Sequence, residues 1–553
     1  MEVSIIPAKQ AGGAPGAGAT ARASSGNREL APAGLRLMAD PGTRLVAGGA
    51  VIVGGSPVRV LRLTPAGARQ VGGWFAGTPL PAGAGARALA RRLLDAGIAH
   101  PDLAAVRPAT GESGGTAARA FAAPVDAVSA EETRCPGPAE VTVVIPVRDR
   151  HTELARCLAG LGDRAGPGDT EQARPRVIVV DDASADPEAI SRIAAEHGAT
   201  VIHRPVNGGP GAARNTGLAA AETEFVAFLD SDCVPRPGWL DRLLPHFADP
   251  AAGAVAPRIV PHEQGTGWLA RYEGASSTLD MGARRSIVRP GARVSYVPGA
   301  ALVVRRVAAG DGFRDGMYVG EDVDFIWRLG AAGWRVRYEP GAVMGHDHRV
   351  TFRAWFTRRA DYGTSAAALE DLHPGAVRPL YASWWTVGSW AAVLSGRPAT
   401  AAALTAAATA LLARRLSRVT GERWPLPAAA KRFGSFPRPP HEGAAWELAV
   451  RLAGGGTVAA GRPLGSALSR TWWPLAIPAA FAVRRLRLPV AVLILAPPLL
   501  DWADRRPPLD PARYVAARLL DDAAYSLGVW QGCLARRTIR PLLPMIGGRR
   551  QPG

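Results

Sequence analysis

Two aspartates separated by one residue, Asp230 and Asp232, follow the apolar pair Phe228 and Leu229. Side chains at positions i and i+2 of an extended strand point the same way, so we expect both carboxylates to converge on one hard divalent cation. Such a cation can neutralise the charge of a diphosphate. The spacing therefore predicts a site for a hard divalent cation that serves a phosphate-containing substrate.

A second acidic pair, Glu321 and Asp322, opens the amphipathic stretch 323–329. Acids at the start of a helix often do no more than complement the helix dipole. A carboxylate in such a position can also act as a general base toward a hydroxyl group. The pattern by itself leaves both interpretations open.

The segments before these acids predict the sheet that positions them. Residues 141–146 (VTVVIP) and 177–180 (VIVV) are β-branched runs typical of buried parallel strands. The second run ends at Asp181 and Asp182, and ligands of an open α/β sheet bind outside the carboxyl ends of its strands. Residues 207–215 (NGGPGAARN) form a glycine-rich turn that opens a helix and suits close approach to a nucleotide.

In chain order, the motifs VIPVR, VVDDxS, NGGxGxARN, LDSD and GEDxD resemble those of the inverting family-2 glycosyltransferases, which have the GT-A fold. The resemblance covers about residues 139–372. It implies an α/β, Rossmann-like core that transfers a sugar from a UDP-sugar with the aid of Mg²⁺ or Mn²⁺. Each motif alone can be an ordinary turn or a surface acid, but the ordered set is not explained in that way.

The resemblance also implies a role for individual side chains. Asp232 would hold the metal together with His346, with His348 as the fallback. In the second acidic pair, Asp322, next to Glu321, would be the general base that deprotonates the acceptor hydroxyl. Donor binding would fall to Pro146, Val147, Asp181, Asp182, Arg214, Asn215 and Asp230.

Three further positions have a chemical interpretation. The guanidinium of Arg214 would reach ribose or phosphate, or else form a salt bridge that supports the start of its helix. Residues 296–301 (YVPGAA) resemble the acceptor-side loop of the family. Trp334 offers an apolar platform for a sugar ring.

Composition limits the class of protein. A chain of 553 residues is expected to form two or three domains. Its formal charge of +18 comes almost entirely from arginine, and no RRM, helix-turn-helix or basic-aromatic interleaving accompanies it, so we do not expect a nucleic-acid partner. The four cysteines form no C-x-x-C pair, which argues against zinc and a disulfide framework and fits a reducing cytosol.

The composition changes several times along the chain. The predicted parts are a disordered tail (1–32), a small α+β domain (33–105), a linker (106–138), the GT-A domain (139–372) and a mainly α-helical region (373–553). The small domain has two short strands and two helices, the first of them with Thr64 as its N-cap. It resembles the winged-helix-like PqqD domains, which implies a leader peptide or a biosynthetic partner as its ligand.

The last region contains long uncharged stretches. Residues 380–396 and 398–413 have no charge, and neither reaches the roughly 20 residues of a membrane span. Residues 488–500 are shorter still and contain three prolines. Buried helices, interfacial segments and a tight membrane hairpin all fit this pattern. We favour membrane association on the cytoplasmic side of the cell membrane because arginines flank the stretches.

A family-2 transferase behind a PqqD-like domain resembles the glycosyltransferases of mycofactocin biosynthesis. That resemblance implies glucose transfer from UDP-glucose to premycofactocin, a peptide-derived redox cofactor, and growth of a β-linked oligoglucose chain. One alternative is a cell-envelope transferase that adds galactofuranose or rhamnose to a polysaccharide or lipid. Another is a catalytically inactive peptide-docking scaffold, against which the intact acidic pairs speak.

Overall fold

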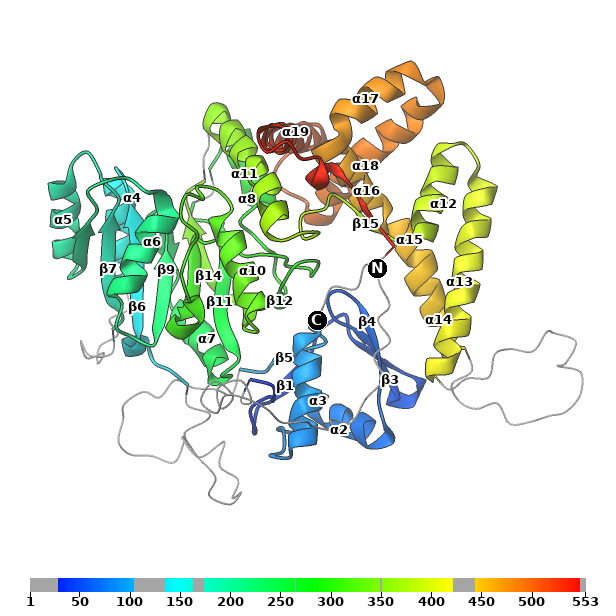
Figure 1. Ribbon diagram of the computed structural model, residues 1–553, viewed down its shortest axis with the longest axis horizontal. Coiled ribbons are helices and arrows are strands. Elements are labelled where there is room, and N and C mark those ends of the chain that lie inside the picture. The colour runs from blue at the N-terminus through cyan, green and yellow to red at the C-terminus, as the bar shows by residue number, and fades with distance from the viewer. Residues whose placement is uncertain are drawn as a thin grey trace, which may run out of the picture. The chain divides into compact units, whose positions relative to one another are not determined.

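The computed structural model describes residues 28–103, 135–162, 174–263, 265–348, 351–420 and 443–547. These residues fall into two compact units, which we call the sheet unit (28–40 and 73–352) and the helical unit (41–72 and 353–547) (Figure 1). Most of the predicted tail and linker lies outside the described residues. The predicted small domain, 33–105, contributes to both units.

The sheet unit contains a nine-stranded mixed sheet of order β10-β14-β11-β13-β9-β6-β7-β8, with β12 paired to β14. Its strands are β6 (Val141–Val147), β7 (Arg176–Asp181), β8 (Thr200–His203), β9 (Phe225–Leu229), β10 (Cys233–Pro235), β11 (Ala252–Pro261), β12 (Ser286–Val288), β13 (Ala301–Arg305) and β14 (Arg335–His346). The two strands predicted from the β-branched runs are confirmed as β6 and β7, which pair in parallel. All seven residues of β6 are buried, as expected of a central parallel strand.

Helices connect and cover these strands. They are α4 (His151–Gly162), α5 (Pro187–Glu196), α6 (Gly209–Ala220), α7 (Trp239–Leu243), α8 (Trp268–Ser276), α9 (Arg306–Ala309) and α10 (Glu321–Ala331). Helix α6, which the glycine-rich turn opens, packs on β6 and β7. Its approach is so close that a Cβ atom at Gly217 would overlap the side chain of Val144. The α/β core predicted from the sequence is therefore present, with the carboxyl ends of β6, β7 and β9 at one edge.

An ion cluster joins the N-terminal part of the sheet unit to this core. Helix α3 (Ala84–Asp95) carries Arg91, which donates two hydrogen bonds to Asp249, at 2.9 and 2.6 Å. Arg337 of β14 donates to the same carboxylate at 2.5 Å, and all three side chains are buried. Burial alone would raise the pKa of Asp249, but Arg337 and Arg91 lower it to about 2. The short pair β1 (Leu37–Ala39) and β5 (Ala99–Pro101) completes this part.

The helical unit begins with a small antiparallel sheet. Strands β2 (Arg44–Val46), β3 (Val51–Gly54) and β4 (Arg59–Arg62) pair in that order, and α2 (Pro65–Phe75) follows. The predicted N-cap is confirmed, because Gly67 N donates to Thr64 Oγ1 at 3.1 Å. Val51 and Val60 pack in one cluster with Ala413 and Leu416 of the helical region.

The rest of the helical unit confirms the prediction of a mainly α-helical C-terminal region. Its elements are α11 (Phe352–Leu372), β15 (Tyr381–Ala382), α12 (Trp384–Leu394), α13 (Pro398–Thr420), α14 (Ala444–Ala449), η7 (Val450–Gly455), α15 (Gly456–Ala459), α16 (Gly461–Ala467), η8 (Leu468–Trp472), α17 (Trp473–Ala482), η9 (Arg484–Leu486), α18 (Arg487–Arg505), α19 (Pro511–Ala535), η10 (Arg540–Leu542) and β16 (Met545–Ile546). Within the described residues, one helical stretch, Arg484–Arg505, is long and apolar enough to cross a membrane, judged by length and composition alone.

The buried ion cluster generates a stability prediction. We expect Arg91→Ala to lower the free energy of unfolding by roughly 3–5 kcal/mol, because it removes a partner from a buried carboxylate. Urea or thermal unfolding of the full chain measures the change. The matched control is Arg92→Ala, one residue later on the same helix but exposed, for which we expect a change within about 0.5 kcal/mol.

The same cluster sets a direction for the pH dependence. The pKa of Asp249 is lowered in the folded state, so its stabilising contribution is present above the unfolded value of about 4 and is lost as the pH falls toward 2. Equal unfolding free energies for wild type and Arg91→Ala at neutral pH would contradict this account of the cluster.

Candidate active site

The two aspartates of the LDSD motif lie in a turn. Strand β9 ends at Leu229, Cys233 N donates to Asp230 O at 3.0 Å, and β10 begins at Cys233. The expectation that both carboxylates point the same way from an extended strand is therefore wrong, since the turn reverses the local direction of the chain. The carboxylate of Asp230 contacts Arg214, whereas that of Asp232 lies near His346.

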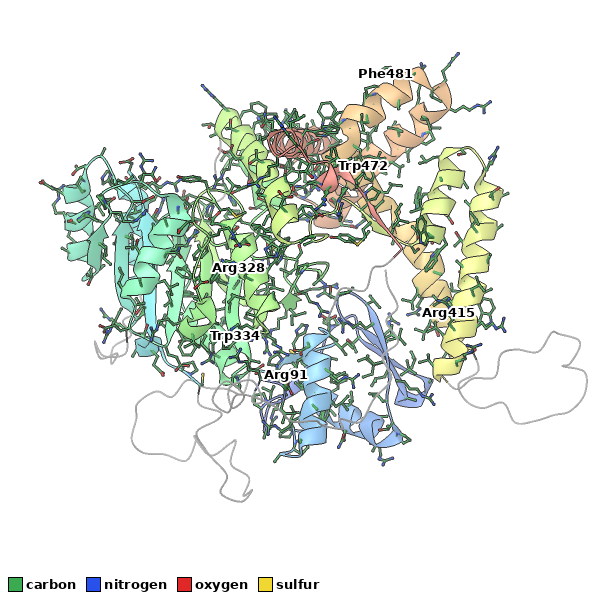
Figure 2. The ribbon with its side chains drawn as sticks, viewed as in Figure 1. Arg91, Arg328, Trp334, Arg415, Trp472 and Phe481 are labelled. Atoms are coloured by element: carbon green, nitrogen blue, oxygen red, sulfur yellow. The ribbon has the colours of Figure 1, made fainter. Side chains whose placement is uncertain are left out.

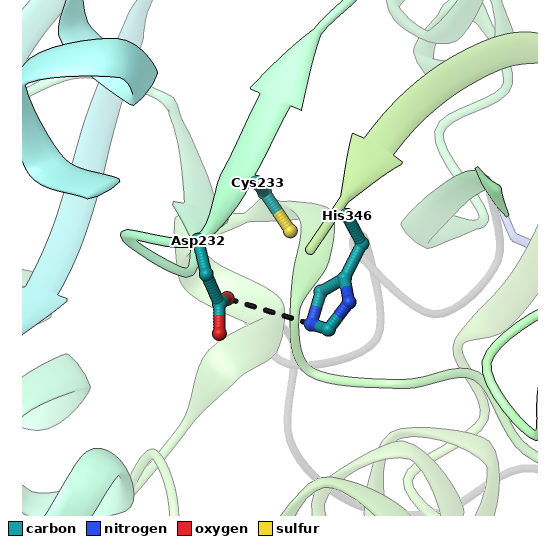
Figure 3. Close-up of side chains that lie close together, drawn as sticks. All are labelled: Asp232, Cys233 and His346. Atoms are coloured by element: carbon teal, nitrogen blue, oxygen red, sulfur yellow. Dashed lines mark ion pairs between the residues drawn. The ribbon is translucent and has the colours of Figure 1, made fainter. Parts of the chain in front are cut away.

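Strand pairing brings His346 to Asp232. In the antiparallel pair β10–β14, Cys233 lies opposite His346, the last residue of β14. The Nε2 atom of His346 is 3.5 Å from Oδ1 of Asp232 (Figure 3). The ring of His348 lies 5.4 Å from that of His346, between centroids. Arg150 also donates a hydrogen bond to Oδ2, the other carboxylate oxygen of Asp232.

This arrangement fits a hard divalent cation. An oxygen and a nitrogen ligand atom 3.5 Å apart can share one ion, and Mg²⁺ commonly keeps its other positions for water and phosphate. Cys233 forms a cluster with Asp232 and His346, in which the possible ligand atoms all lie within 4.8 Å of one another. Burial raises the pKa of its thiol, aided by Asp232 and Asp230, and a soft protonated sulfur is a poor ligand for Mg²⁺ or Mn²⁺. Asp232 and His346 are thus the residues suited to this metal.

Arg214 links the two acidic motifs. From the first turns of α6, its buried guanidinium donates to Asp230 at 2.6 Å and to Glu321 at 3.0 Å. Burial alone would lower the pKa of Arg214, but the two carboxylates raise it, so the group stays charged. The contacts show the salt bridge at the start of the helix, and the predicted contact of Arg214 with ribose or phosphate stays a prediction.

The second acidic pair places its two carboxylates in different surroundings. Helix α10 begins after Gly320, whose φ of 81° requires a residue free to adopt the left-handed region. Glu321 is buried, and this burial raises the pKa of its carboxyl, as does the neighbouring Asp322, against the opposing effect of Arg214. Asp322 is only half-buried, and its Oδ2 accepts a hydrogen bond from Gly299 N at 2.8 Å.

That contact connects Asp322 to residues 296–301, the predicted acceptor-side loop. The fit is tight, because a Cβ atom at Gly299 would lie 3.0 Å from Cβ of Asp322 and 3.3 Å from Nη1 of Arg214. A half-buried carboxylate beside this loop can accept a proton from a hydroxyl group. Asp322 is therefore the better-placed base of the pair.

At the carboxyl end of β7, Asp181 and Asp182 have separate partners. Asp181 accepts from Ser184 N at 3.0 Å and pairs with His203 Nδ1 at 2.8 Å. Burial would raise the pKa of Asp181, but these hydrogen bonds lower it. Asp182 accepts from the backbone N–H groups of Gly208 and Gly209, at 3.0 and 2.8 Å, and so fixes the glycine-rich turn to the strand end.

A cleft of about 370 Å³ opens beside Asp181, between β7, α5 and β8. It is lined by Asp181, Ala183, Ser184, Pro187, Glu188, Ser191, His203, Arg204 and Pro205. Pro146 and Val147 lie next to this edge, with Val147 paired to Asp181 across β6 and β7. Their predicted contact with the nucleotide base stays a prediction.

Two further side chains have contacts that their predicted roles did not include. The side-chain amide of Asn215 donates from Nδ2 to Phe313 O and accepts at Oδ1 from Phe313 N, at 2.7 Å each. In this conformation the side chain holds a loop. Its predicted role in donor binding stays a prediction. Trp334 precedes β14, whereas His346 ends that strand, and the ten residues of β11 that run beside β14 span roughly 30 Å. The guanidinium of Arg28 lies over the Trp334 ring instead, 3.7 Å from its centroid, so the sugar-platform interpretation is wrong.

Sequence reasoning missed Arg150, Arg204 and Gly299. Arg150 contacts Asp232, and Arg204 contacts Asp182, across 82 and 22 residues of chain, respectively. The only available signal was position, since Arg150 follows the VIPVR motif by two residues. Gly299 lay inside the loop predicted to face the acceptor, but nothing in its type indicated a bond to the base.

Residues 142–310 match the model of the glycosyl transferase family 2. Over 526 residues the chain is 39% identical to the pre-mycofactocin glycosyltransferase of Mycobacterium tuberculosis (strain ATCC 25618 / H37Rv), covering 93% of this chain and 98% of that protein. The chain belongs to the pre-mycofactocin glycosyltransferase family. It is a family-2 glycosyltransferase and an enzyme, with the GT-A-like core that its motifs predicted.

More distant relatives of the transferase cover only parts of it. The N-acetylglucosaminyltransferase of Rhizobium meliloti (strain 1021) is 29% identical over 242 residues, or 40% of this chain and 55% of that protein. Among solved structures, the mannosyltransferase PcManGT from Pyrobaculum calidifontis, in complex with GDP-Man and Mn²⁺, is 24% identical with a TM-score of 0.34. That likeness covers 56% of this chain and 81% of the mannosyltransferase chain.

The metal-binding geometry generates the second prediction. We expect sugar transfer to stop in excess chelator and to return with Mn²⁺ or Mg²⁺, and Asp232→Asn to lower turnover at least about 100-fold, because it weakens charge neutralisation of the leaving diphosphate. Mn²⁺ binding, followed by calorimetry or by EPR, should weaken in the same variant. Asp315→Asn, an exposed acid that is not part of the cluster, is the matched control. Full activity of the wild-type enzyme in chelator would contradict the assignment.

The contrast between Glu321 and Asp322 generates the third prediction. Asp322→Asn should lower turnover by about 10² to 10⁴, because the amide keeps the volume and removes the basicity. Steady-state kinetics and UDP binding measure the effect, and UDP affinity should change little. Glu321→Gln, which keeps an acceptor for Arg214, should have the smaller effect on turnover. If the order of the two variants is reversed, Glu321 is the base.

Proposed function

We propose that the transferase moves glucose from UDP-glucose onto premycofactocin with inversion, and builds a β-linked oligoglucose chain in mycofactocin biosynthesis. The observation that carries this proposal is the match over nearly the whole length of the pre-mycofactocin glycosyltransferase, at 39% identity. A relative matched only in the sheet unit would support sugar transfer in general and leave the acceptor open. Here the small sheet and the helical region are matched as well.

The proposed reaction is an in-line displacement. The carboxylate of Asp322 takes the proton of the acceptor hydroxyl, and the resulting oxygen nucleophile forms a bond to the anomeric carbon while the bond to UDP breaks. Attack from the face opposite UDP converts the α-linkage of the donor into a β-linkage. Gly299 N supports this role by orienting Asp322 toward the loop 296–301.

The remaining residues of the site bind and orient the donor in this proposal. Asp232 and His346 would hold Mg²⁺ or Mn²⁺, which when bound supplies neutralisation of the diphosphate charge. Asp181 and the cleft beside it would receive the nucleoside. Arg214 keeps Asp230 in place through their hydrogen bond.

For residues 33–105 we propose a recognition role toward a leader peptide or a biosynthetic partner. Strand β2 supports this role, since it lies at the edge of its three-stranded sheet and two of its three residues are exposed. An exposed edge strand can accept an extended peptide as an additional strand. A deletion does not test this role cleanly, because the same segment supplies Arg91 to the buried ion cluster.

The two alternatives make different predictions for acceptor and activity. A cell-envelope transferase would glycosylate a lipid or polysaccharide acceptor, and the exposed apolar surface of the helical unit is the one observation that favours it. An inactive scaffold would transfer no sugar, and the placement of Asp232 and Asp322 in polar, partly accessible positions argues against it.

The experiment supplies the purified full chain with Mn²⁺, premycofactocin and, in parallel, UDP-glucose, UDP-galactose, UDP-N-acetylglucosamine, GDP-mannose and dTDP-rhamnose. We expect mass spectrometry to detect hexose addition with UDP-glucose, β-glucosidase to remove the added sugars, and Asp322→Asn to abolish the product. Transfer to a lipid-linked or polysaccharide acceptor, with none to premycofactocin from any donor, would overturn the proposal in favour of the envelope transferase.

A further inference from the structure

The hairpin formed by α17, η9 and α18 exposes an apolar surface. At its turn, which we call the tip (residues 481–488), Phe481 and Leu488 are each 74% exposed, and Val483 is 47% exposed. Figure 2 shows Phe481 at the outer end of the hairpin. Farther along the helices, Leu475 and Val492 are 61% and 53% exposed.

This surface is larger than scattered exposed residues would explain. The most apolar 18-residue segment of the stretch Arg484–Arg505 has a mean hydropathy of 1.5, yet only 17% of it is buried. A core helix of similar composition would be mostly buried. Contiguous apolar surface of this kind normally marks a site that another phase or molecule covers.

The charges at the tip indicate what covers it. Between positions 471 and 500 the sequence has three charged residues, the arginines Arg484, Arg485 and Arg487, and no acid. All three arginine side chains are exposed and lie within the tip. Apolar side chains interleaved with cations complement the headgroup region of an anionic membrane, where acyl chains lie next to phosphate groups.

The positions of the charges decide between crossing a membrane and lying on it. Residues 488–500 are the uncharged part of α18, and thirteen residues of helix span about 20 Å, against about 30 Å for the hydrocarbon core. Helix α17 has 10 residues, about 15 Å. If the hairpin entered the membrane with its tip first, the arginines of the tip would lie inside the hydrocarbon, which is unfavourable for guanidinium groups.

We propose that the tip docks this transferase onto an anionic lipid surface without spanning it. Phe481, Val483 and Leu488 enter the boundary between headgroups and acyl chains. Arg484, Arg485 and Arg487 contact lipid phosphates. The docking leaves the sugar-transfer chemistry in water and is independent of which acceptor the enzyme uses.

The experiment is co-sedimentation of the purified full chain with vesicles of phosphatidylcholine alone, or with added phosphatidylglycerol. We expect binding to the anionic vesicles, weakened by salt, and little binding to the neutral ones. Each arginine near an anionic surface contributes a factor of about five. Arg484→Gln with Arg485→Gln should therefore weaken binding by roughly 30-fold, whereas Arg513→Gln, exposed on α19, should leave it unchanged.

A variant and a matched control test how much the apolar side chains contribute to vesicle binding. Phe481→Ser with Leu488→Ser should abolish vesicle binding, whereas Leu534→Ser should not, although Leu534 is also 74% exposed. Thermal unfolding and gel filtration check that each variant is folded. These positions are exposed, so the variants should unfold at the wild-type temperature.

Four results would overturn the proposal. The first is an absence of wild-type binding to either vesicle, and the second is binding that survives the change of Phe481 and Leu488. The third is a dimer that dissociates in that same variant, which would assign the surface to a second copy of the chain. The fourth is resistance of vesicle-bound protein to alkaline carbonate extraction, which would indicate a spanning segment.

Discussion

The active site depends on one buried cation. Arg214 holds Asp230 and Glu321 together from α6, and thereby ties the turn after β9 to the start of α10. A buried guanidinium is stable only with such partners, so the turn after β9 and the start of α10 must both lie beside α6 for Arg214 to stay charged in the core. Because Asp322 follows Glu321 directly, the same bond fixes the distance between the proposed base and the metal-binding turn.

The balance of charge around that cation suits the substrate. Asp230, Asp232, Glu321 and Asp322 surround two guanidinium groups, those of Arg150 and Arg214. Carboxylates therefore outnumber guanidinium groups by two at this site, and a divalent cation has the charge that offsets this excess. The elevated pKa of Glu321 is the local sign of this excess, since burial and Asp322 both disfavour its ionised form.

Local sequence predicted the parts of this site that depend on local conformation. The strands β6 and β7, the helix after the glycine-rich turn and the N-cap at Thr64 all follow from residue type and spacing. The rest depends on contacts between distant segments. Strand pairing between β10 and β14 decides that His346 lies beside Asp232, and no local pattern encodes it.

The errors have the same origin. The two carboxylates of the LDSD motif were expected to be parallel because a strand was assumed to continue, whereas a turn intervenes after Leu229. Trp334 has the residue type of a sugar platform but lies at the opposite end of β14. For both, the spacing was compatible with the chemistry, and the tertiary position was not determined by it.

The ion pair between Arg91 and Asp249 has a consequence for the order of events during synthesis. The two residues are separated by 158 positions, so Arg91 leaves the ribosome roughly 8 to 30 s before its partner does, at 5–20 residues per second. During that interval, the guanidinium of Arg91, which is buried in the finished protein, has neither Asp249 nor Arg337 beside it. Helix α3 can therefore complete its ionic contact with the sheet only after the segment that carries Asp249 and Arg337 has been made, so this contact belongs to a late step of folding.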